Sequence, residues 1–159
     1  MINQSQVHGD WVDEIVDKYA DMVFRIAFTH TKNRTDADDV FQEVFLKLCK
    51  SGIVFESTEH IKAWLIKVTI STSRKLFTSA WNKKVVELPR DLPHEDRDYT
   101  GVLDAVKSLP QKYRSVVYLF YFEDMPINEI SKTLKVKEST IKSQLSRARN
   151  LLKGGFEDE

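Results

Sequence analysis

Apolar residues recur along most of this chain at the spacing of one face of an α-helix. The first stripe predicts a helix over 11–31, with the apolar positions Val12, Ile15, Val16, Tyr19, Val23, Ile26 and Ala27. A second helix is expected from Thr35, as N-cap, to Gly52, as terminator. A third is expected over 59–81 with Thr58 as its cap, after a loop at 51–57 whose apolar residues look exposed.

The second half of the chain shows the same period after an interruption. Residues 87–99 carry two prolines and dense charge, which predicts a flexible linker. A fourth helix is expected over 100–109, stopped by Pro110, and a fifth over 110–123 with Pro110 in its first turn. Two short helices joined by a tight turn near 135–137 then fill residues 126–153.

No stretch of the chain alternates apolar and polar residues convincingly enough to predict a strand. We therefore predict an all-α fold of two small helical domains joined by the flexible linker. The first domain covers 1–86, and the second, with a helix-turn-helix, covers 100–159.

Charge is distributed in blocks, although the formal net charge is zero. Residues 61–86 hold six basic side chains and no acidic one. Residues 130–153 hold seven basic side chains and one acidic residue, Glu138. Acids are in excess over 1–60 and 87–129. The two basic blocks are candidate nucleic-acid surfaces, and an acidic surface suits a basic partner.

Little in the composition points outside a reducing compartment. Cys49 is the single cysteine, and it suits a small core or boundary position in an apolar-periodic helix. No signal-peptide core follows Met1, and no apolar run reaches the roughly 20 residues of a membrane span. A cytoplasmic location is the expectation.

The last predicted helix has one apolar and one cationic side. Its apolar side carries Ile141, Leu145, Ala148 and Leu152, and its other side carries Lys142, Ser143, Ser146, Arg147 and Arg149. A helix of this kind can enter a DNA major groove. A merely solvated face of a helical bundle is the alternative. The lack of any acid between Glu138 and the last basic residue, Lys153, favours DNA.

An acidic cluster, formed by Asp36, Asp38, Asp39 and Glu43, has three interpretations. The first-turn acids compensate the helix dipole, and the exposed members suit a basic protein partner. A metal or acid–base site would need further ligands, and the scattered histidines do not supply them. We expect no catalytic site, metal or cofactor. Among the aromatics of the basic third helix, Trp64 is assigned to the core, while Phe77 and Trp81 suit either packing or base stacking.

Three motifs in order resemble bacterial sigma factors of the extracytoplasmic-function (ECF) group. DADDVFQEVFLKL (36–48) is similar to the helix that docks on the coiled-coil clamp of RNA polymerase. HIKAWLIKVTISTSRKLFTSAWNKK (60–84) is similar to the segment that opens and reads the minus-ten promoter element. Residues 109–152 are similar to the domain that reads the minus-thirty-five element. The resemblance covers 11–153 and implies a specificity subunit of polymerase that is not itself an enzyme.

The resemblance also implies site residues. Core polymerase would be bound by Asp36, Asp39, Gln42 and Glu43, with Phe45 packing behind. Single-stranded minus-ten DNA would be bound by the 51–58 loop and by Lys62, Lys67, Ser71, Arg74 and Lys75. Minus-thirty-five duplex would be bound by Lys137, Ser139, Thr140, Lys142, Ser143, Gln144 and Arg147, with Arg149 on phosphates. No small-molecule substrate is implied.

The resemblance also implies how the protein is regulated, and the chain departs from the family pattern at several positions. The family is usually held inactive by an anti-sigma factor, often membrane-bound, and is nucleoid-associated when active. This chain has Ser71 where Asn is frequent, Lys75 where Asp is frequent, and Lys135 where a turn Gly is usual. Lys137 replaces a common Ser or Thr cap, and Gln144 often aligns with Arg.

Two functions of other classes remain as alternatives. One is a stand-alone dimeric DNA-binding repressor or activator, which has no need of the acidic docking face at 36–48. The other is an enzyme centred on Asp36–Glu43.

Overall fold

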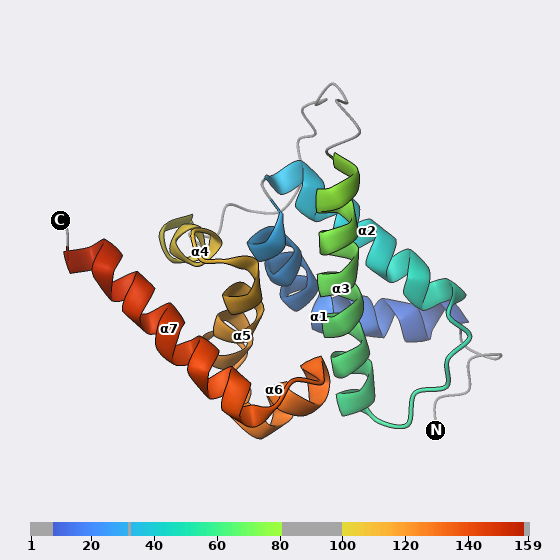
Figure 1. Ribbon diagram of the computed structural model, residues 1–159. Helices are drawn as coiled ribbons and strands as arrows, with labels where there is room; N and C mark the ends of the chain where they lie inside the picture. Colours follow the sequence, from blue (N-terminus) through green and yellow to red (C-terminus); the bar gives the residue numbers. More distant parts are fainter. Residues whose placement is uncertain (1–7, 32, 81–99, 158–159) are drawn as a thin grey trace. The chain divides into compact units, whose positions relative to one another are not determined.

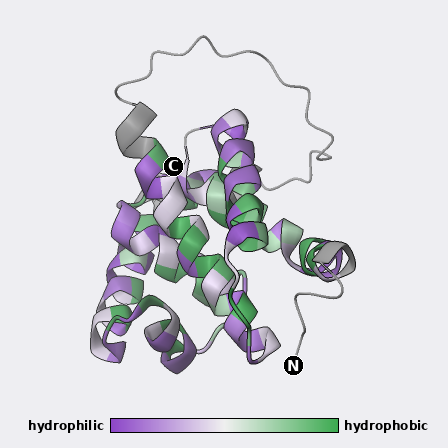
Figure 2. Ribbon diagram, turned by 90° about the vertical axis from the view of Figure 1, so that its right-hand side faces the viewer, coloured by the Kyte–Doolittle hydropathy of each residue, from purple (hydrophilic) through white to green (hydrophobic). Residues whose placement is uncertain are grey.

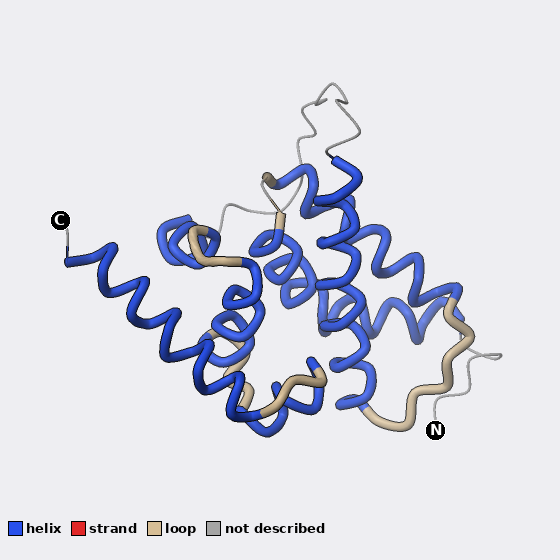
Figure 3. The backbone as a smooth tube through the Cα atoms, viewed as in Figure 1, coloured by secondary structure: helices blue, strands red, loops and turns tan. Residues whose placement is uncertain are grey.

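All regular secondary structure is helical in the residues that the computed structural model describes, which are 8–31, 33–80 and 100–157. Figure 1 labels the helices and Figure 3 shows the loops between them. The all-α expectation is confirmed for these residues. The helices are α1 (His8–His30), α2 (Arg34–Lys50), α3 (Thr58–Ala80), α4 (Thr100–Lys107), α5 (Gln111–Tyr121), α6 (Ile127–Leu134) and α7 (Glu138–Glu157).

Contacts divide the chain into two compact units, Met1–Pro89 and Arg90–Glu159. In the first unit, α1, α2 and α3 each contact the other two. In the second, α5 contacts α4, α6 and α7, and α6 also contacts α7. The predicted linker at 87–99 lies outside the described residues, as do Trp81 and the side chain of Phe77.

The first unit is a three-helix bundle with a continuous apolar interior. In Figure 2 the helices carry both apolar (green) and polar (purple) residues, as amphipathic helices around a core do. The most deeply buried side chains include Val23, Ile26, Val40, Val44, Leu48, Leu65 and Ile66. Val23 and Ile26 belong to the apolar stripe predicted over 11–31, so the 3.6-residue period located the interior face of α1.

Two predicted helix caps are wrong by one or two residues. Asn33, and not Thr35, caps α2, because its side-chain oxygen accepts a hydrogen bond from the Asp36 N–H at 2.8 Å. Ser57, and not Thr58, caps α3, because its hydroxyl accepts from the His60 N–H at 3.1 Å. Each pair offers two residues able to cap a helix, and the entering backbone decides between them.

The loop between α2 and α3 is anchored by a residue that the sequence left exposed. Phe55 is buried and stacks on Trp11 of α1, with ring centroids 5.9 Å apart. Its ring also lies steeply inclined to that of Trp64, with an interplanar angle of 76° and centroids 5.8 Å apart. Val54 beside it is half exposed. Trp64, which the sequence assigned to the core, is only half-buried and packs its ring against that of Phe55.

The second unit is built around α5. Tyr118 and Leu119 are fully buried, and the Tyr118 hydroxyl donates to Glu123 Oε1 at 2.8 Å. α4 ends at Lys107, two residues before the predicted 109. Pro110 does not lie inside the first turn of α5 as predicted but caps it, because its carbonyl accepts from the Tyr113 N–H at 2.9 Å.

α6 and α7 meet in a tight turn whose central residue is strained. Lys135 adopts the left-handed conformation, with φ 57° and ψ 46°, where glycine is usual. Ser131 holds the turn from α6. Its carbonyl accepts from the Lys135 and Val136 N–H groups, and its hydroxyl donates to the Val136 carbonyl at 2.6 Å. The turn therefore fixes the position of the N-terminus of α7 relative to α6.

Candidate functional site

α7 packs through a narrow apolar side and leaves the rest of its surface open. Ile141, Leu145 and Ala148 are completely buried against the unit. The predicted DNA-contacting residues on this helix and its cap are exposed, and these are Lys137, Ser139, Thr140, Lys142, Ser143, Arg147 and Arg149. Gln144 is an exception, because it is half-buried at the edge of the packed side. Ser146 and Asn150 are also exposed on the open face.

The open face of α7 has two flanks. Successive residues turn by about 100° around a helix, so Lys142, Arg149 and Lys153 lie along one flank. Thr140 and Arg147 lie along the other. Arg147 forms a hydrogen bond to the Tyr113 hydroxyl of α5. This bond is the main cause that lowers the pKa of Tyr113. A guanidinium has five N–H donors, so others remain for an external acceptor.

Not every cation of the second unit belongs to this face. The Nε of Arg114 donates to the Leu109 carbonyl at 2.7 Å, which ties α5 to the turn after α4. Burial lowers the pKa of Arg114. Arg114 therefore supports the fold, while the basic block of α7 faces outward.

α2 carries an acidic surface on the side away from the bundle core. Asp36, Asp39, Gln42 and Glu43 share this side at helical spacing. Gln42 and Glu43 are exposed, while Asp36 and Asp39 are half-buried. Phe45 is buried behind them and meets Phe41 with ring centroids 4.8 Å apart. These residues therefore lie together as the sequence predicts.

Sequence reasoning missed one residue of this surface. Leu46 is 56% exposed and lies between Glu43 and Lys50 on the same side of α2. Its exposure could have been predicted from its position around the helix, because Leu46 points to a different side from the buried residues Val44 and Leu48. Leu46 adds exposed apolar area to the acidic side of α2. Asp38, in contrast, is buried and does not belong to the surface.

The basic residues of α3 do not all lie together. Lys67, Ser71, Arg74 and Lys75 share one side of the helix, and the last three are exposed. Lys62 is half-buried and lies on the side that carries Ile66 and Ser73. The half-buried Trp64 shares the side of Lys67 and Ser71. The arrangement places an aromatic ring among cations, which suits an unstacked base.

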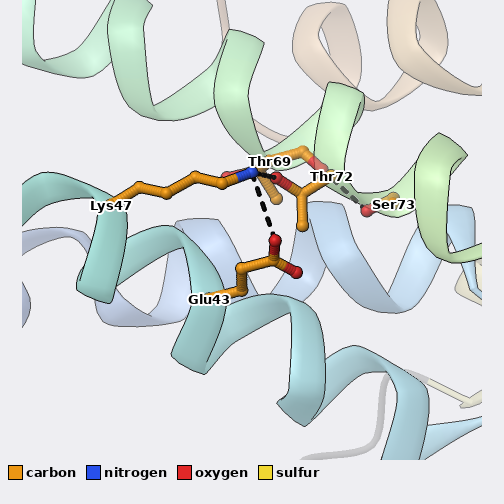
Figure 4. Close-up of polar contacts among 5 residues, drawn as sticks. All are labelled: Glu43, Lys47, Thr69, Thr72 and Ser73. Atoms are coloured by element: carbon orange, nitrogen blue, oxygen red, sulfur yellow. Dashed lines mark hydrogen bonds and ion pairs between the residues drawn. The ribbon is translucent and has the colours of Figure 1, made fainter.

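A polar contact joins the acidic surface to α3. The Lys47 Nζ lies 3.3 Å from Glu43 Oε1 and donates to Thr72 Oγ1 at 3.1 Å (Figure 4). Thr72 is only 1% exposed, and its neighbours Thr69 and Ser73 are also buried. Those two hydroxyls donate within α3, to the carbonyls of Leu65 at 2.5 Å and Thr69 at 2.7 Å.

The described residues offer no arrangement for a metal. Within 8–31, 33–80 and 100–157, no three His, Cys, Asp or Glu side chains are grouped as metal ligands. In the same residues, no helix is long and apolar enough to cross a membrane. Cys49 is half-buried, at the boundary of the first bundle.

Sequence families match both units of the chain. Residues 15–83 match the family described as Sigma-70 region 2, and the match spans most of α1 and all of α2 and α3. Residues 100–152 match the family described as Sigma-70, region 4, which spans α4 to most of α7. The two matches lie on either side of residues 84–99.

Individual proteins resemble the chain along most of its length. It is 31% identical over 170 residues to the ECF RNA polymerase sigma factor SigM of Bacillus subtilis, covering 93% of this chain and 99% of SigM. The fold is similar to CnrH in its complex with the cytosolic domain of CnrY, with a TM-score of 0.72, 18% identity and coverage of 96% and 93%. It is also similar to the sigma factor RpoE of Bartonella quintana in complex with the anti-sigma factor NepR, with a TM-score of 0.65, 19% identity and coverage of 89% and 94%.

Proposed function

The chain belongs to the extracytoplasmic-function group of RNA polymerase sigma factors, and from this premise we propose how its surfaces divide the work of transcription initiation. As a sigma factor it directs promoter-specific initiation. Members of this family are not catalytic enzymes. In our proposal residues 1–86 bind polymerase and the minus-ten element, 87–99 link, and 100–159 bind the minus-thirty-five element.

The acidic surface of α2 docks on core polymerase in this proposal. The contacting residues are Asp36, Asp39, Gln42 and Glu43, with Leu46 adding exposed apolar area and Phe45 supporting them from inside. The observation that carries the proposal is the alignment of these side chains on the one side of α2 that faces away from the bundle. Carboxylates around an apolar centre favour a partner helix with basic and apolar residues.

The side of α3 that carries Lys67, Ser71, Arg74 and Lys75, called the strip on α3, captures the unstacked strand of the minus-ten element. Lys67, Arg74 and Lys75 supply charge for phosphates, and Ser71 supplies a hydrogen-bonding group between them. Trp64 supplies a half-buried aromatic ring beside Phe55 of the loop at 51–57. Lys62 has a different position and is assigned to the phosphates near the start of α3.

The open face of α7 enters the major groove of the minus-thirty-five element. Residues near the N-terminus of such a helix reach base edges, so we assign base contacts to Lys137, Ser139, Thr140, Lys142 and Ser143, with Gln144 and Arg147 beside them. Arg149 lies almost two turns further along and is assigned to a phosphate. The two domains act together through the effective concentration that the linker sets.

The remaining partners follow from the same role. We propose core RNA polymerase, promoter DNA in duplex and single-stranded form, and an anti-sigma factor as partners in the cytoplasm. The protein would be nucleoid-associated when active. A membrane-bound anti-sigma factor would hold it at the membrane while it is inactive. The proposal includes no small-molecule substrate, cofactor or metal.

The decisive experiment measures the affinity of the full chain for bacterial core RNA polymerase. Asp39→Lys should weaken binding at least tenfold, because it places a cation in the middle of the acidic surface. Asp17→Lys is the matched control, since Asp17 is an exposed acid on α1, outside that surface. Equal effects of the two reversals would contradict the docking surface. A folded wild-type chain that failed to bind polymerase would favour a stand-alone DNA-binding repressor.

A further inference from the structure

We propose that Thr72 of α3 is a positioning residue for the polymerase-docking surface of α2, acting through Lys47 on Glu43. The inference rests on the proposed docking role of α2. Thr72 does not belong to that surface, since it lies on another helix and is buried. Its connection to the surface is the Lys47 ammonium, which contacts Thr72 Oγ1 and Glu43 Oε1 (Figure 4).

Lys47 lies between a buried anchor and an exposed carboxylate. The side chain of Lys47 is 38% exposed, and that of Glu43 is 53% exposed. An unsupported lysine carries several freely rotating bonds, and an exposed pair one helical turn apart is loosely held. The bond to Thr72 fixes the ammonium at the α2–α3 boundary. Glu43 is thereby offered one defined position for its Oε1.

Thr72 differs from the other buried hydroxyls of α3. Thr69 and Ser73 donate to carbonyls one turn earlier in their own helix, which such residues commonly do. Thr72 accepts a hydrogen bond from another helix. Its hydroxyl therefore has a consequence beyond α3, because it determines where a charge of α2 lies.

A fixed carboxylate binds a partner at lower entropic cost. Glu43 uses Oε1 for Lys47, and because its side chain is 53% exposed and a carboxylate has two accepting oxygens, it can still accept from a donor of the polymerase. Ordering a flexible side chain on binding opposes association, so a side chain that is already ordered binds more tightly. Loss of the anchor should weaken polymerase binding about three- to tenfold.

The test compares Thr72→Val, Thr72→Ser and Lys47→Met in the full chain, with the dissociation constant for core polymerase as the main measurement. Thr72→Val removes the acceptor at nearly constant shape and should weaken binding about three- to tenfold, whereas Thr72→Ser keeps the acceptor and should bind as the wild type does. Lys47→Met should weaken binding to a similar extent, and Thr72→Val should add nothing to it. Thermal unfolding of each variant accompanies the measurement.

Three results would overturn the inference. They are an unchanged affinity in Thr72→Val, a loss in Thr72→Ser equal to that in Thr72→Val, or additive losses in the double variant. If Thr72→Val unfolds, Lys47→Met carries the test alone, since its partly exposed side chain can change without opening the core, and Lys47→Arg should restore binding. Asp39→Lys separates the two levels. If Asp39→Lys weakens polymerase binding and Lys47→Met does not, only the role of Thr72 is contradicted. If Asp39→Lys does not weaken polymerase binding, the docking surface is contradicted too.

Discussion

α3 and α7 are both basic helices, yet they leave very different surfaces for DNA. Between Ile61 and Ser73, seven of thirteen residues of α3 are buried, because both α1 and α2 pack against it. Between Glu138 and Lys153, only three of sixteen residues of α7 are buried. A helix that lies in a major groove needs most of its circumference open, and α7 has it. The strip on α3 has room for one strand.

The largest expected effect concerns how each helix is held. Leu145→Ala truncates one of the three side chains that α7 buries between Glu138 and Lys153, and it should destabilise the second unit by about 2–5 kcal/mol. Binding of a minus-thirty-five duplex should be lost while polymerase binding remains. Leu65→Ala in α3 is the matched variant for the first unit and should reverse this pattern. Equal damage to both activities by Leu145→Ala would show that the units do not act separately.

The next effect tests whether α7 reads sequence at its N-terminal end. Lys142→Met keeps most of the side chain and removes the charge, so it should cost about 1–3 kcal/mol against the preferred base at one promoter position. Competition binding with a set of singly substituted duplexes measures this. A uniform loss across all duplexes would assign Lys142 to a phosphate.

A smaller effect, this time a gain in stability, is expected at the turn that positions α7. Lys135→Gly relieves the left-handed backbone and should stabilise the second unit by about 0.5–1 kcal/mol, since the relief exceeds the added freedom of the unfolded chain. Lys132→Gly, at an exposed helical position of α6, is the control and should lose about 1 kcal/mol. Denaturant unfolding distinguishes them, and a loss of stability in Lys135→Gly would mean that its side chain contributes to the fold.

The smallest effect lies further along the same flank of α7. Arg149→Ala should lower affinity evenly for all duplex sequences and reduce the slope of log affinity against log salt by about one unit. Lys142→Met, measured over the same salt range, provides the comparison. A change of base preference in Arg149→Ala would move Arg149 from the phosphates to the bases.

The sequence predicted the helices of the described residues, because each has an apolar stripe of the right period. It also predicted that Lys135 lies where the chain turns. It failed where two neighbouring residues have similar chemistry, as with Asn33 and Thr35 at the start of α2. It failed again for Phe55, since a lone aromatic in a loop has no periodicity that would reveal burial.

The candidate site was predictable in part for the same reasons. The acidic side of α2 and the open face of α7 follow from spacing within one helix, so sequence alone brings their members together. The family resemblance grouped Lys62 with Lys67 and Arg74, and the phase of Lys62 on the helix separates it from them. Leu46 was overlooked because an apolar residue in a helix is usually counted with the core.

By itself the sequence determined the family, the all-α class and the residues that share each helix face, since these depend on composition and on local geometry. Only the tertiary structure decided which side chains contact one another across separate elements. Phe55 stacks on Trp11, Arg147 forms a hydrogen bond with Tyr113, and Lys47 of α2 donates to Thr72 of α3. These pairs are distant in the chain, and their contact depends on how one helix packs on another. That packing results from the summed burial of the whole apolar core, which no single motif encodes.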